Sequence, residues 1–240
     1  MTKKRQIFVV TILSLLGFIM LINFNRIPNQ FQYANSVYQH IVNNAVSETG
    51  SLNFVTAILY DYRAYDSLGE STIIFGAVSG IVLLLSRKTL PVSSHGLSFI
   101  VKRTFGMLTP FIFLFSIYIM AHGHLSPGGG FQGGVILGAI SIIFSIVYGS
   151  EFDYKRYSPT AKTLLETGGA LLFIGLGILG MIVGGNFLMN VKILNSELGT
   201  LASGGSIPFI NIGIGFKIGA GLAIIFYSMI QKTFKEGVDL

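Results

Sequence analysis

The stretch FGMLTPFIFLFSIYIMAHGHLSPGGGFQGGVILGAISIIFSIVYG, from Phe105 to Gly149, decides the fold of this chain. Both of its ends are apolar runs close to the ~20 residues that a helix needs to cross a bilayer. Between them lies the polar, glycine-rich motif HGHLSPGGGFQGG, His122 to Gly134. Proline and glycine favour a sharp turn. The stretch therefore predicts two antiparallel membrane helices, Phe105–Ala121 and Phe131–Gly149, joined by a polar bend.

Four more apolar runs of similar length flank this pair: Ile7–Phe24, Leu68–Ser86, Thr163–Gly184 and Phe209–Ile230. Of the 240 residues, 51% are hydrophobic and 11% are charged, whereas a soluble domain carries about 25% charged residues. The composition therefore predicts an all-α, polytopic membrane protein with six transmembrane helices. Pairs of glycines four residues apart predict close helix contacts: Gly134 and Gly138, Gly180 and Gly184, and Gly215 and Gly219.

The basic side chains indicate the topology. If the N-terminus is cytoplasmic, the segments inside hold Lys3, Lys4, Arg5, Arg87, Lys88, Lys102, Arg103, Lys155, Arg156, Lys162, Lys232 and Lys235, and those outside hold only Arg26, Arg63 and Lys192. This bias follows the positive-inside rule, so we expect both termini in the cytoplasm and the protein in the cell membrane. The net charge of +6 is then a topology signal and not a sign of nucleic-acid binding. The first run is long and lacks a small-residue cleavage site, which predicts an uncleaved anchor.

The long segment between the first two apolar runs predicts two short amphipathic helices on the outer face. They are QYANSVYQHIVNNAVSE, residues 32–48, and LNFVTAILYDYRAYDS, residues 52–67, with Ser51 as the expected N-cap of the second. A cytoplasmic linker, LPVSSHGLS, follows at residues 90–98. It predicts a boundary between a two-helix N-terminal unit, residues 1–98, and a four-helix unit, residues 99–240.

Three ionisable groups lie within or at the edge of the apolar runs, where a charge is costly and indicates function. Lys217 is near the middle of the last run, with Gly213 and Gly221 one turn away on the same face. This small face predicts close packing, so Lys217 is a candidate for an ion or proton path. The alternative is a lysine that snorkels or pairs within a complex.

The two carboxylates leave alternatives open as well. Glu70 follows Asp61, Arg63 and Asp66 near the outer end of the second run. It is either an ion-pair partner of Arg63 or the mouth of a cation pathway, for which Asp61 and Asp66 are further candidates. Glu166, near the cytoplasmic end of the fifth run, is either an ion-transfer residue or the partner of Lys162 four residues earlier.

Three kinds of site could use such a polar motif: a phosphate cradle, a metal site and a hydrolase centre. A phosphate cradle needs a preceding strand and a following lysine, and neither is present. His122 and His124 have no third ligand nearby, so no metal site is expected. Ser126 is followed by Pro127, and the motif holds no acid for a hydrolase. The remaining interpretation is a bend whose polar groups bond the broken backbone or line a wet cavity, built from Pro127, Gly128, Gly129, Gly130, Gln132 and Gly134.

The chain has no cysteine, which excludes Cys-bound iron–sulfur clusters and Cys-ligated zinc. We therefore expect no cofactor bound by this chain and no catalytic centre of its own. If the protein serves an enzyme, it does so as a subunit of an ion-translocating oxidoreductase whose metal clusters lie on partners.

Two motifs carry a family resemblance. GHLSPGGGFQGGVILGA, residues 123–139, closely resembles the signature of the B subunit of the Mrp multisubunit sodium/proton antiporters, and IPFINIGIGFKIGAGL, residues 207–222, resembles the last helix of that subunit. Upstream, TGSLNFVTAILYDYRAYDSLGESTIIFGAVSGI, residues 49–81, is similar to the C-terminal end of the large A subunit of that family. A separate E-type subunit carries this region in Mrp-containing membrane-bound hydrogenases. Where the family reads Asp-Phe-Arg-Gly and Asp-Thr, this chain has Asp61-Tyr62-Arg63-Ala64 and Asp66-Ser67.

The resemblance implies a membrane subunit of a complex that exchanges sodium ions for protons. By the family pattern, Glu70 is the carried-over candidate for ion transfer. His122, His124, Pro127 and Gln132 belong to the B-type signature, and Lys217 to the last helix. The implied partners are the C, D, F, G and A-like Mrp subunits, within the lipid bilayer, with hydrogenase or other redox subunits in a redox-driven complex. The alternative is a scaffold that holds neighbouring subunits and transports nothing.

Overall fold

The computed structural model describes residues 11, 14–15, 17–22, 31–85, 96–149, 152–153, 158–192 and 197–236. The chain forms two compact units, Met1–Asn44 and Ala45–Leu240. The second unit contains the polar motif and all the candidate ion-transfer residues.

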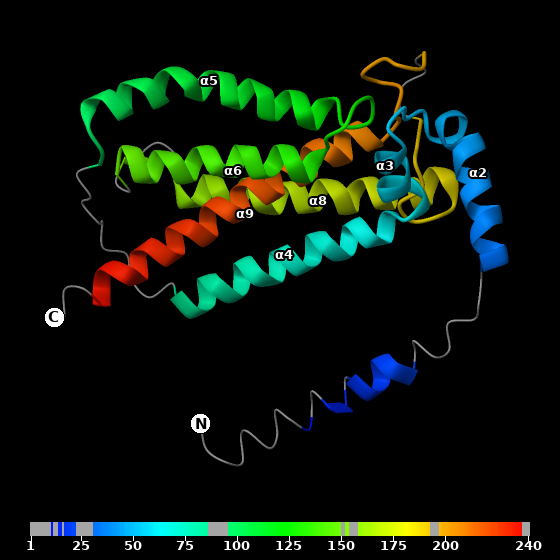
Figure 1. Ribbon diagram of the computed structural model, residues 1–240, viewed down its shortest axis with the longest axis horizontal. Coiled ribbons are helices and arrows are strands. Elements are labelled where there is room, and N and C mark those ends of the chain that lie inside the picture. Colours follow the sequence, from blue (N-terminus) through cyan, green and yellow to red (C-terminus); the bar gives the residue numbers. More distant parts are fainter. Residues whose placement is uncertain are drawn as a thin grey trace. The chain divides into compact units, whose positions relative to one another are not determined.

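Five long helices form the second unit: α4 (Ala64–Leu85), α5 (Phe99–Ala121), α6 (Gly130–Val147), α8 (Pro159–Gly184) and α9 (Ile207–Glu236). Each is long and apolar enough to cross a membrane, and they lie side by side in Figure 1. The described residues contain no strand. The all-α membrane fold is thus confirmed. The predicted first span, Ile7–Phe24, falls largely outside the described residues, so the sixth helix and the sidedness of the termini stay predictions.

Helix α9 is the centre of the bundle. It contacts α4, α5, α6 and α8, and it is the most buried of the five helices. Close contact is achieved where glycines meet: Gly134 of α6 lies against Gly215 of α9, and Gly138 lies against Gly219. A Cβ atom added at Gly134 would lie 2.7 Å from the Gly215 carbonyl oxygen. These glycines are confirmed as helix contacts, whereas Gly180 and Gly184 pack against Met189 in the turn after α8.

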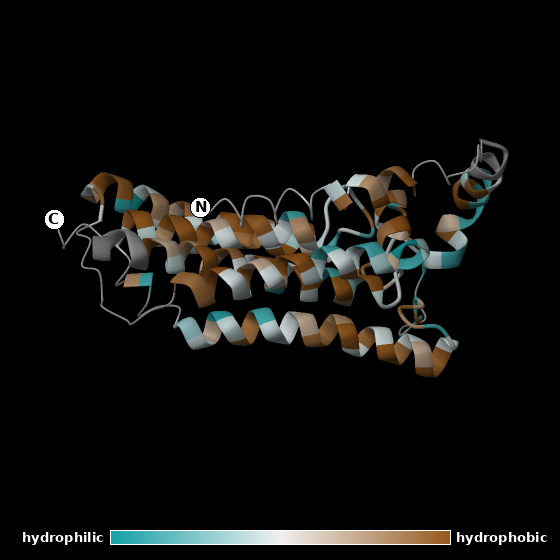
Figure 2. Cartoon of the chain, turned by 90° about the horizontal axis from the view of Figure 1, so that it is seen from below, coloured by the Kyte–Doolittle hydropathy of each residue, from teal (hydrophilic) through white to brown (hydrophobic). Residues whose placement is uncertain are grey.

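Helices α4, α5 and α8 expose large apolar side chains, and hydrophobic residues, coloured brown, make up much of the helices in Figure 2. The most exposed large side chains on these helices are Leu83, Leu84, Phe99, Ile100, Ile182, Ile73 and Phe111, each more than 70% exposed. Such a surface suits lipid or neighbouring membrane subunits, because its exposure to water would be unfavourable. Figure 2 also shows hydrophilic residues gathered toward the ends of the helices.

The segment before α4 differs from the prediction. The first amphipathic helix is present as α2 (Phe31–Thr49), but the second is a short α3 (Phe54–Ala57) followed by a π-helix, η1 (Ile58–Tyr62). Arg63 then leaves the helical conformation, with φ −128° and ψ 37°, and α4 begins at Ala64 and so includes Asp66 and Ser67. The bend is held by the Ser67 hydroxyl, which donates to the Leu59 carbonyl at 2.8 Å. This hydrogen bond connects the two sides of the break in the helix. The spacing of apolar residues could not predict it.

Ser51 was wrongly predicted as the N-cap. The N-cap of α3 is Asn53, whose side-chain oxygen accepts the Val55 N–H at 3.1 Å. The Ser51 hydroxyl instead donates to the His124 carbonyl at 2.9 Å, because tertiary contact with the polar motif takes precedence over the local cap.

The packing of α8 against α9 generates a test with a built-in control. A Cβ atom at Gly169 would meet the Gly213 carbonyl and would lie 2.9 Å from Lys217 Cβ, whereas a Cβ at the adjacent Gly168 meets nothing within 4 Å. We expect Gly169→Ala to lower the stability of the assembled protein by about 1–3 kcal/mol through overpacking. Gly168→Ala should leave it unchanged or raise it slightly. Thermal melting of the two detergent-purified variants measures the difference, and equal melting temperatures would contradict the close approach.

Candidate functional site

Lys217 is a buried cation in the middle of the bundle. It lies near the centre of the spanning part of α9 and is 1% exposed. Its side chain reaches α4, where the ammonium donates to the Ser71 carbonyl oxygen at 2.9 Å and lies 5.6 Å from the centre of the Phe75 ring. A backbone carbonyl and an aromatic face stabilise a cation only partially. The predicted packing of Lys217 away from lipid is confirmed, and its ammonium does not snorkel to the membrane surface.

Glu166 supplies the opposite charge. It lies on α8, is 4% exposed, and is close enough to Lys217 to interact with it electrostatically. Its Oε1 atom is buried without a hydrogen-bond partner among the described residues, and it lies 3.7 Å from the position of a Cβ added at Gly221. Val78 and Ile74 of α4 approach the same position beside Gly221, so the carboxylate lies at the junction of α4, α8 and α9. A carboxylate oxygen with no partner in such a place is a costly arrangement.

The surface bridge between Glu166 and Lys162 is not formed. The Lys162 ammonium instead contacts Asp153 Oδ2 at 2.5 Å, and both residues are buried. The Ser141 hydroxyl donates to the other Asp153 oxygen at 3.0 Å, and the Lys162 ammonium lies 5.3 Å from the centre of the Tyr227 ring. Sequence spacing suggested the i−4 pair, but Asp153, outside the fifth apolar run, competes for the same lysine. Asp153 and Ser71 are two residues of the site that the sequence analysis missed.

Together these groups form a series of buried charges of alternating sign: Asp153, Lys162, Glu166 and Lys217. Lys162 and Glu166 are one turn apart on α8, and Lys217 faces Glu166 from α9. The series extends from the end of α8 that is expected to be cytoplasmic to the middle of α9. Buried charges in a membrane protein indicate ion or proton handling.

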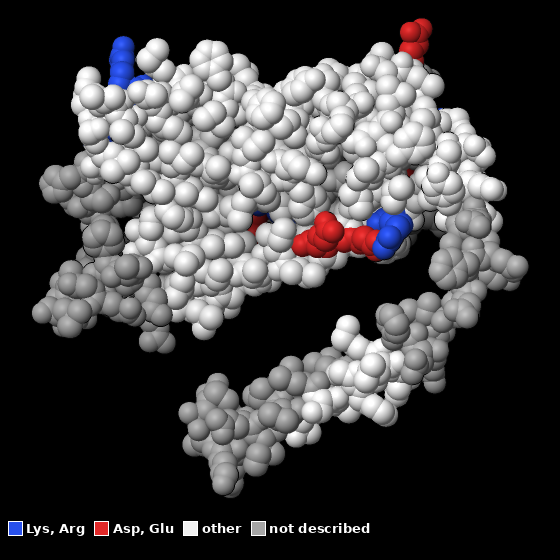
Figure 3. All heavy atoms as spheres, viewed as in Figure 1, with Lys and Arg blue, Asp and Glu red and all other residues white. Residues whose placement is uncertain are grey.

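Glu70 does not join this series. It is exposed on the side of α4 that faces away from the bundle, although its neighbour Ser71 is buried and accepts the Lys217 hydrogen bond. Arg63 forms an ion pair with Asp66 at 2.5 Å, so the predicted alternative of a Glu70–Arg63 pair is not what the structure shows. In Figure 3, acidic and basic atoms lie together on the lower part of the face shown, with white surface around them.

Asp61 lies in η1, outside the spanning segments, and is half-buried. Burial raises the pKa of its carboxyl; a hydrogen bond to the Asn190 backbone opposes the shift, and the charge of Glu48 adds to it. Asp61 and Asp66 therefore stand near the end of α4 that is expected to be outside, remote in the chain from the buried series of charges.

The polar motif forms a compact turn between α5 and α6. His122 stacks on Tyr118, with ring centroids 4.2 Å apart, and Gln132 and Pro127 are exposed. His124 is fully buried, and its Nε2 atom donates to the Thr200 carbonyl at 3.2 Å. The interpretation that its polar groups bond the broken backbone is supported at His124 and Ser126, whose hydroxyl donates to the His122 carbonyl.

Residues from the start of the second unit clamp this turn. Asn53 donates its side-chain N–H groups to the carbonyls of Gly123 at 2.8 Å and Ser126 at 3.0 Å, and its backbone N–H donates to the His124 carbonyl at 3.0 Å. The Thr56 hydroxyl also donates to the Gly123 carbonyl, at 2.6 Å. The segment thus satisfies carbonyls that the turn itself leaves open.

Asn211, also missed by the sequence analysis, supports the turn from the other side. It is fully buried at the start of α9, and its Oδ1 atom accepts the Gly130 N–H at 2.9 Å, which caps α6. Gly129, with φ +145°, leaves room for this amide: a Cβ there would be strained and would lie 3.3 Å from Asn211 Oδ1. A polar residue in the run INIGIGFK was the available signal, but its partner is 81 residues away.

Within the described residues, no group of three or more His, Asp or Glu side chains is arranged to hold a metal ion. His122 and His124 diverge, since one ring stacks on Tyr118 and the other is buried against Thr200.

His124 generates a pH test. Burial lowers the pKa of its imidazole below the usual 6.5, and the charge of His122 adds to this effect, whereas the hydrogen bond to Thr200 opposes it. Because the folded-state pKa is lowered, the stability that neutral His124 contributes is complete above about pH 6.5 and falls as the pH drops below that value. We expect the wild-type melting temperature to fall between pH 7.5 and 5.5 by more than that of His124→Gln.

His122→Gln is the matched control, since His122 lies in the same turn and is only half-buried. It should keep most of the acid sensitivity of the wild type, because burial is the main cause of the lowered His124 pKa and the charge of His122 is a smaller one. A His124→Gln variant with wild-type acid sensitivity would contradict the assignment to His124.

Known proteins share this architecture. A family model described as a domain related to the MnhB subunit of Na+/H+ antiporter matches residues 100–224, and a second, for the E subunit of MBH, matches residues 3–98. An uncharacterised protein of Methanocaldococcus jannaschii is 33% identical over 199 residues, which are 71% of this chain and 74% of that protein.

Two solved structures contain similar chains. One is the membrane-bound sulfane sulfur reductase, an archaeal respiratory membrane complex; the identity is 30%, the TM-score is 0.71, and the match covers 95% of this chain and 98% of that one. The other is the Mrp complex from Dietzia sp. DQ12-45-1b, which shows the same fold at 22% identity and a TM-score of 0.61, over 96% of this chain and 26% of the other. The resemblance predicted from the two motifs is confirmed.

Proposed function

Because this chain belongs to the family of membrane proteins related to the MnhB subunit of Na+/H+ antiporters, with a segment of the MBH E-subunit family before that domain, we propose that it transfers protons within a multisubunit complex that exchanges protons for sodium ions. The observation that carries the proposal is the buried pair of Lys217 and Glu166 at the junction of α4, α8 and α9.

The chemistry of this pair suits transfer rather than support alone. A structural ion pair needs close contact and satisfied hydrogen bonds to offset desolvation. Here the Lys217 ammonium is bonded to the Ser71 carbonyl, and Glu166 keeps an unpartnered oxygen. That oxygen can accept a proton. When Glu166 is protonated, the ammonium of Lys217 loses its balancing charge, and the release of a proton from the pair becomes easier.

The Asp153–Lys162 pair provides the connection to the end of α8. Lys162 lies between Asp153 and Glu166 on the series of alternating charges, so its ammonium can turn from one carboxylate toward the other. A proton that neutralises Asp153 weakens its hold on Lys162 and favours the interaction with Glu166. The protonation of Asp153 at one end of α8 thus changes the charge around Glu166 and Lys217. No ion has to cross the bundle for this to happen.

Glu70 has a different place in the proposal. Its exposed carboxylate on α4 lies one residue from the carbonyl that binds Lys217. In a complex this face of α4 would meet a neighbouring subunit, so Glu70 is proposed to bind the sodium ion or proton at that contact. A carboxylate takes either cation but not both at once, which is the minimum requirement for exchange.

The pair gives the central prediction. In membrane vesicles that contain the whole complex, we expect Glu166→Gln and Lys217→Met each to reduce sodium-dependent proton movement at least about tenfold, which corresponds to about 1.4 kcal/mol in the barrier. Acridine-dye quenching or a pH-sensitive dye measures the movement.

Glu197→Gln is the matched control, because Glu197 is an exposed acid beyond the spanning helices. It should transport at the wild-type rate. If all three variants assemble and transport like the wild type, the chain is a scaffold and the transfer role is wrong. Glu70→Gln tests the proposed contact between α4 and a neighbouring subunit. Loss of transport in this variant, in which Glu166 is unchanged, would support entry of the sodium ion or proton at α4.

A redox-driven setting is the second candidate. It is favoured by one observation: the similar chain of the archaeal respiratory complex matches over 98% of its own length, whereas the similar chain of the Mrp complex matches over only 26%. A chain of similar length that matches both segments is thus present in the respiratory complex, and this supports the redox-driven setting. Purification of the tagged protein in mild detergent tests it. Co-purified iron–sulfur or nickel–iron subunits would support electron-driven sodium export, and antiporter-type membrane subunits alone would support gradient-driven exchange.

A further inference from the structure

The turn that follows α8 folds back into the bundle. Gly185 ends the helix with φ +86°, and the Leu188 N–H then donates to the Gly177 carbonyl at 3.2 Å. Gly177 lies about two turns before the end of α8 at Gly184. A Cβ at Gly177 would lie 2.7 Å from the Phe187 ring and 2.9 Å from Leu188. The absence of a side chain at Gly177 therefore lets the turn lie directly against α8.

Leu188 lies between the buried ion pair and the outer end of the bundle. It is 3% exposed and belongs to a core cluster with Phe173 of α8 and Ile210 of α9. Phe173 is about two turns beyond Glu166 along α8, and Ile210 is about two turns before Lys217 along α9. Phe173, Leu188 and Ile210 thus form an apolar layer on the side of the pair that is expected to face outside.

This layer offers a proton nothing to bind. Tyr60, which belongs to the same cluster, has the one polar side chain among its described buried members. Burial, together with the charge of Glu70, raises the pKa of Tyr60, so its phenol stays neutral. Hydrophobic constrictions of this kind exclude water and so block the passage of ions.

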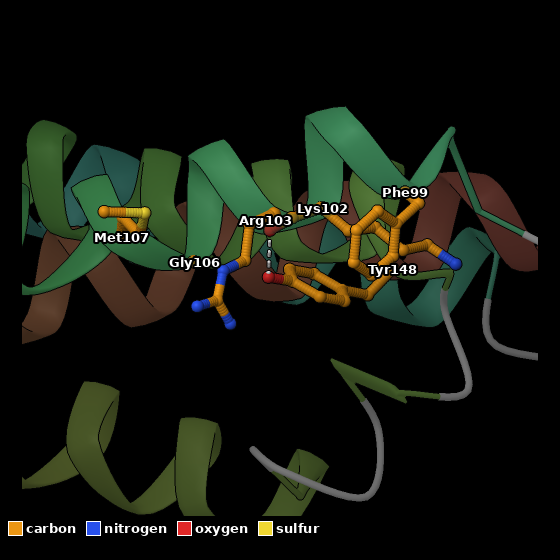
Figure 4. Close-up of a pocket in the computed structure, with 6 residues that line it drawn as sticks. All are labelled: Phe99, Lys102, Arg103, Gly106, Met107 and Tyr148. Carbon is orange, nitrogen blue, oxygen red and sulfur yellow. Dashed lines mark hydrogen bonds between the residues drawn. The ribbon is translucent and has the colours of Figure 1, made fainter.

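The two ends of the bundle differ in polarity. At the end where α5 begins, a cleft of about 510 Å³ opens beside Lys102, Arg103 and Tyr148. The Tyr148 hydroxyl donates to the Lys102 carbonyl at 2.6 Å, as the dashed line in Figure 4 shows. The Tyr148 ring stacks on Phe152, the residue before Asp153. Polar groups thus accompany the start of the series of buried charges, whereas the apolar layer covers its other end.

Leu188 is held in an unusual backbone conformation. Its φ is +63°, and within the part of the chain that the structure describes it is the one residue other than glycine with a positive φ. This conformation is unfavourable for a residue with a side chain, and it persists only where neighbouring contacts enforce it. Here Asn190 supplies them: its side chain donates to the Thr49 carbonyl at 3.0 Å and accepts the Ser206 N–H at 2.9 Å. Its backbone also forms a hydrogen bond with Asp61.

We propose that Leu188 is a gate on the outer side of the Lys217–Glu166 pair. With Leu188 in place, the pair exchanges protons only with the side expected to be cytoplasmic. When the contacts of Asn190 are released, Leu188 relaxes from its strained conformation and leaves the layer, and the pair then exchanges protons with the outer side. The gate rests on the proton-transfer role proposed above and adds to it the control of access that exchange across a membrane requires.

The test measures water access to the pair. The chain has no cysteine, so one introduced thiol in this chain can be followed. Ser71→Cys places a thiol of similar size at a buried position beside Lys217, and Asn186→Cys places one on the exposed part of the turn. Whole complexes in sealed vesicles are labelled from each side with a membrane-impermeant methanethiosulfonate. The side from which Asn186→Cys reacts is taken as the outer side.

We expect outer-side labelling of Ser71→Cys to be slow in an otherwise unchanged chain. Leu188→Ala should accelerate it at least about tenfold, because the loss of a buried leucine side chain opens the layer. Leu198→Ala is the matched control, since Leu198 is 59% exposed and lies beyond the spanning helices. It should leave the labelling rate unchanged.

Equal outer-side labelling of Ser71→Cys with and without Leu188→Ala would overturn the gate. If Leu188→Ala fails to assemble, the chains with unchanged Leu188 still decide. Labelling of Ser71→Cys from the outer side as fast as that of Asn186→Cys would show that the layer is open, and would also overturn the gate.

The labelling needs no transport, so the two proposals fail separately. Loss of the gate would leave the transport defects of Glu166→Gln and Lys217→Met as they are. Loss of the proton-transfer role would leave the labelling rates as they are.

Discussion

The burial of the Lys217 ammonium is the constraint on which the rest of the bundle depends. An ammonium at the centre of a membrane helix needs a polar partner within reach, and its partners come from two other helices, the Ser71 carbonyl of α4 and the carboxylate of Glu166 on α8. Both helices must therefore lie close to α9. A glycine makes this approach feasible on α8, because Gly169 leaves room for the stem of the Lys217 side chain. The small and the charged residues of these helices depend on each other. The small residues let the helices approach, and the close approach brings the buried charges together.

The two sequence segments that match different families are interdependent in the structure. Ser71 and Phe75 belong to the segment related to the E subunit of MBH, and Lys217 and Glu166 belong to the MnhB-related domain. The same division occurs at the polar turn, where Asn53 and Thr56 satisfy carbonyls of Gly123 and Ser126. Hydrogen bonds at one end and a buried cation in the middle thus join the segments. A compact unit that begins at Ala45 and continues to the C-terminus follows from these contacts.

The polar turn supports the bundle through its hydrogen bonds. Its buried groups bond backbone: His124 with Thr200, Ser51 with His124 and Asn211 with Gly130. A break between two membrane helices leaves N–H and C=O groups open, and the apolar surroundings make each open group costly. The turn sequence meets this need with glycines that let the backbone fold tightly, and with partners supplied from α3 and α9. Its neutral, buried histidine couples the same turn to pH.

The fold class and the approximate positions of five helices follow from the sequence, because long apolar runs are local signals of membrane helices. The family follows from the resemblance carried by the two motifs at residues 123–139 and 207–222. The sequence also identified Lys217 as buried, from the small residues on its own face. Only the tertiary structure decided the partners. Glu166 interacts with Lys217 and not with Lys162, which instead forms an ion pair with Asp153. The Ser51 hydroxyl donates to the His124 carbonyl and does not cap a helix. These choices depend on groups brought together from distant parts of the chain, and the free energy of a buried charge depends on all of its neighbours at once. The spacing of residues within a single helix therefore cannot predict the partners of a buried charge.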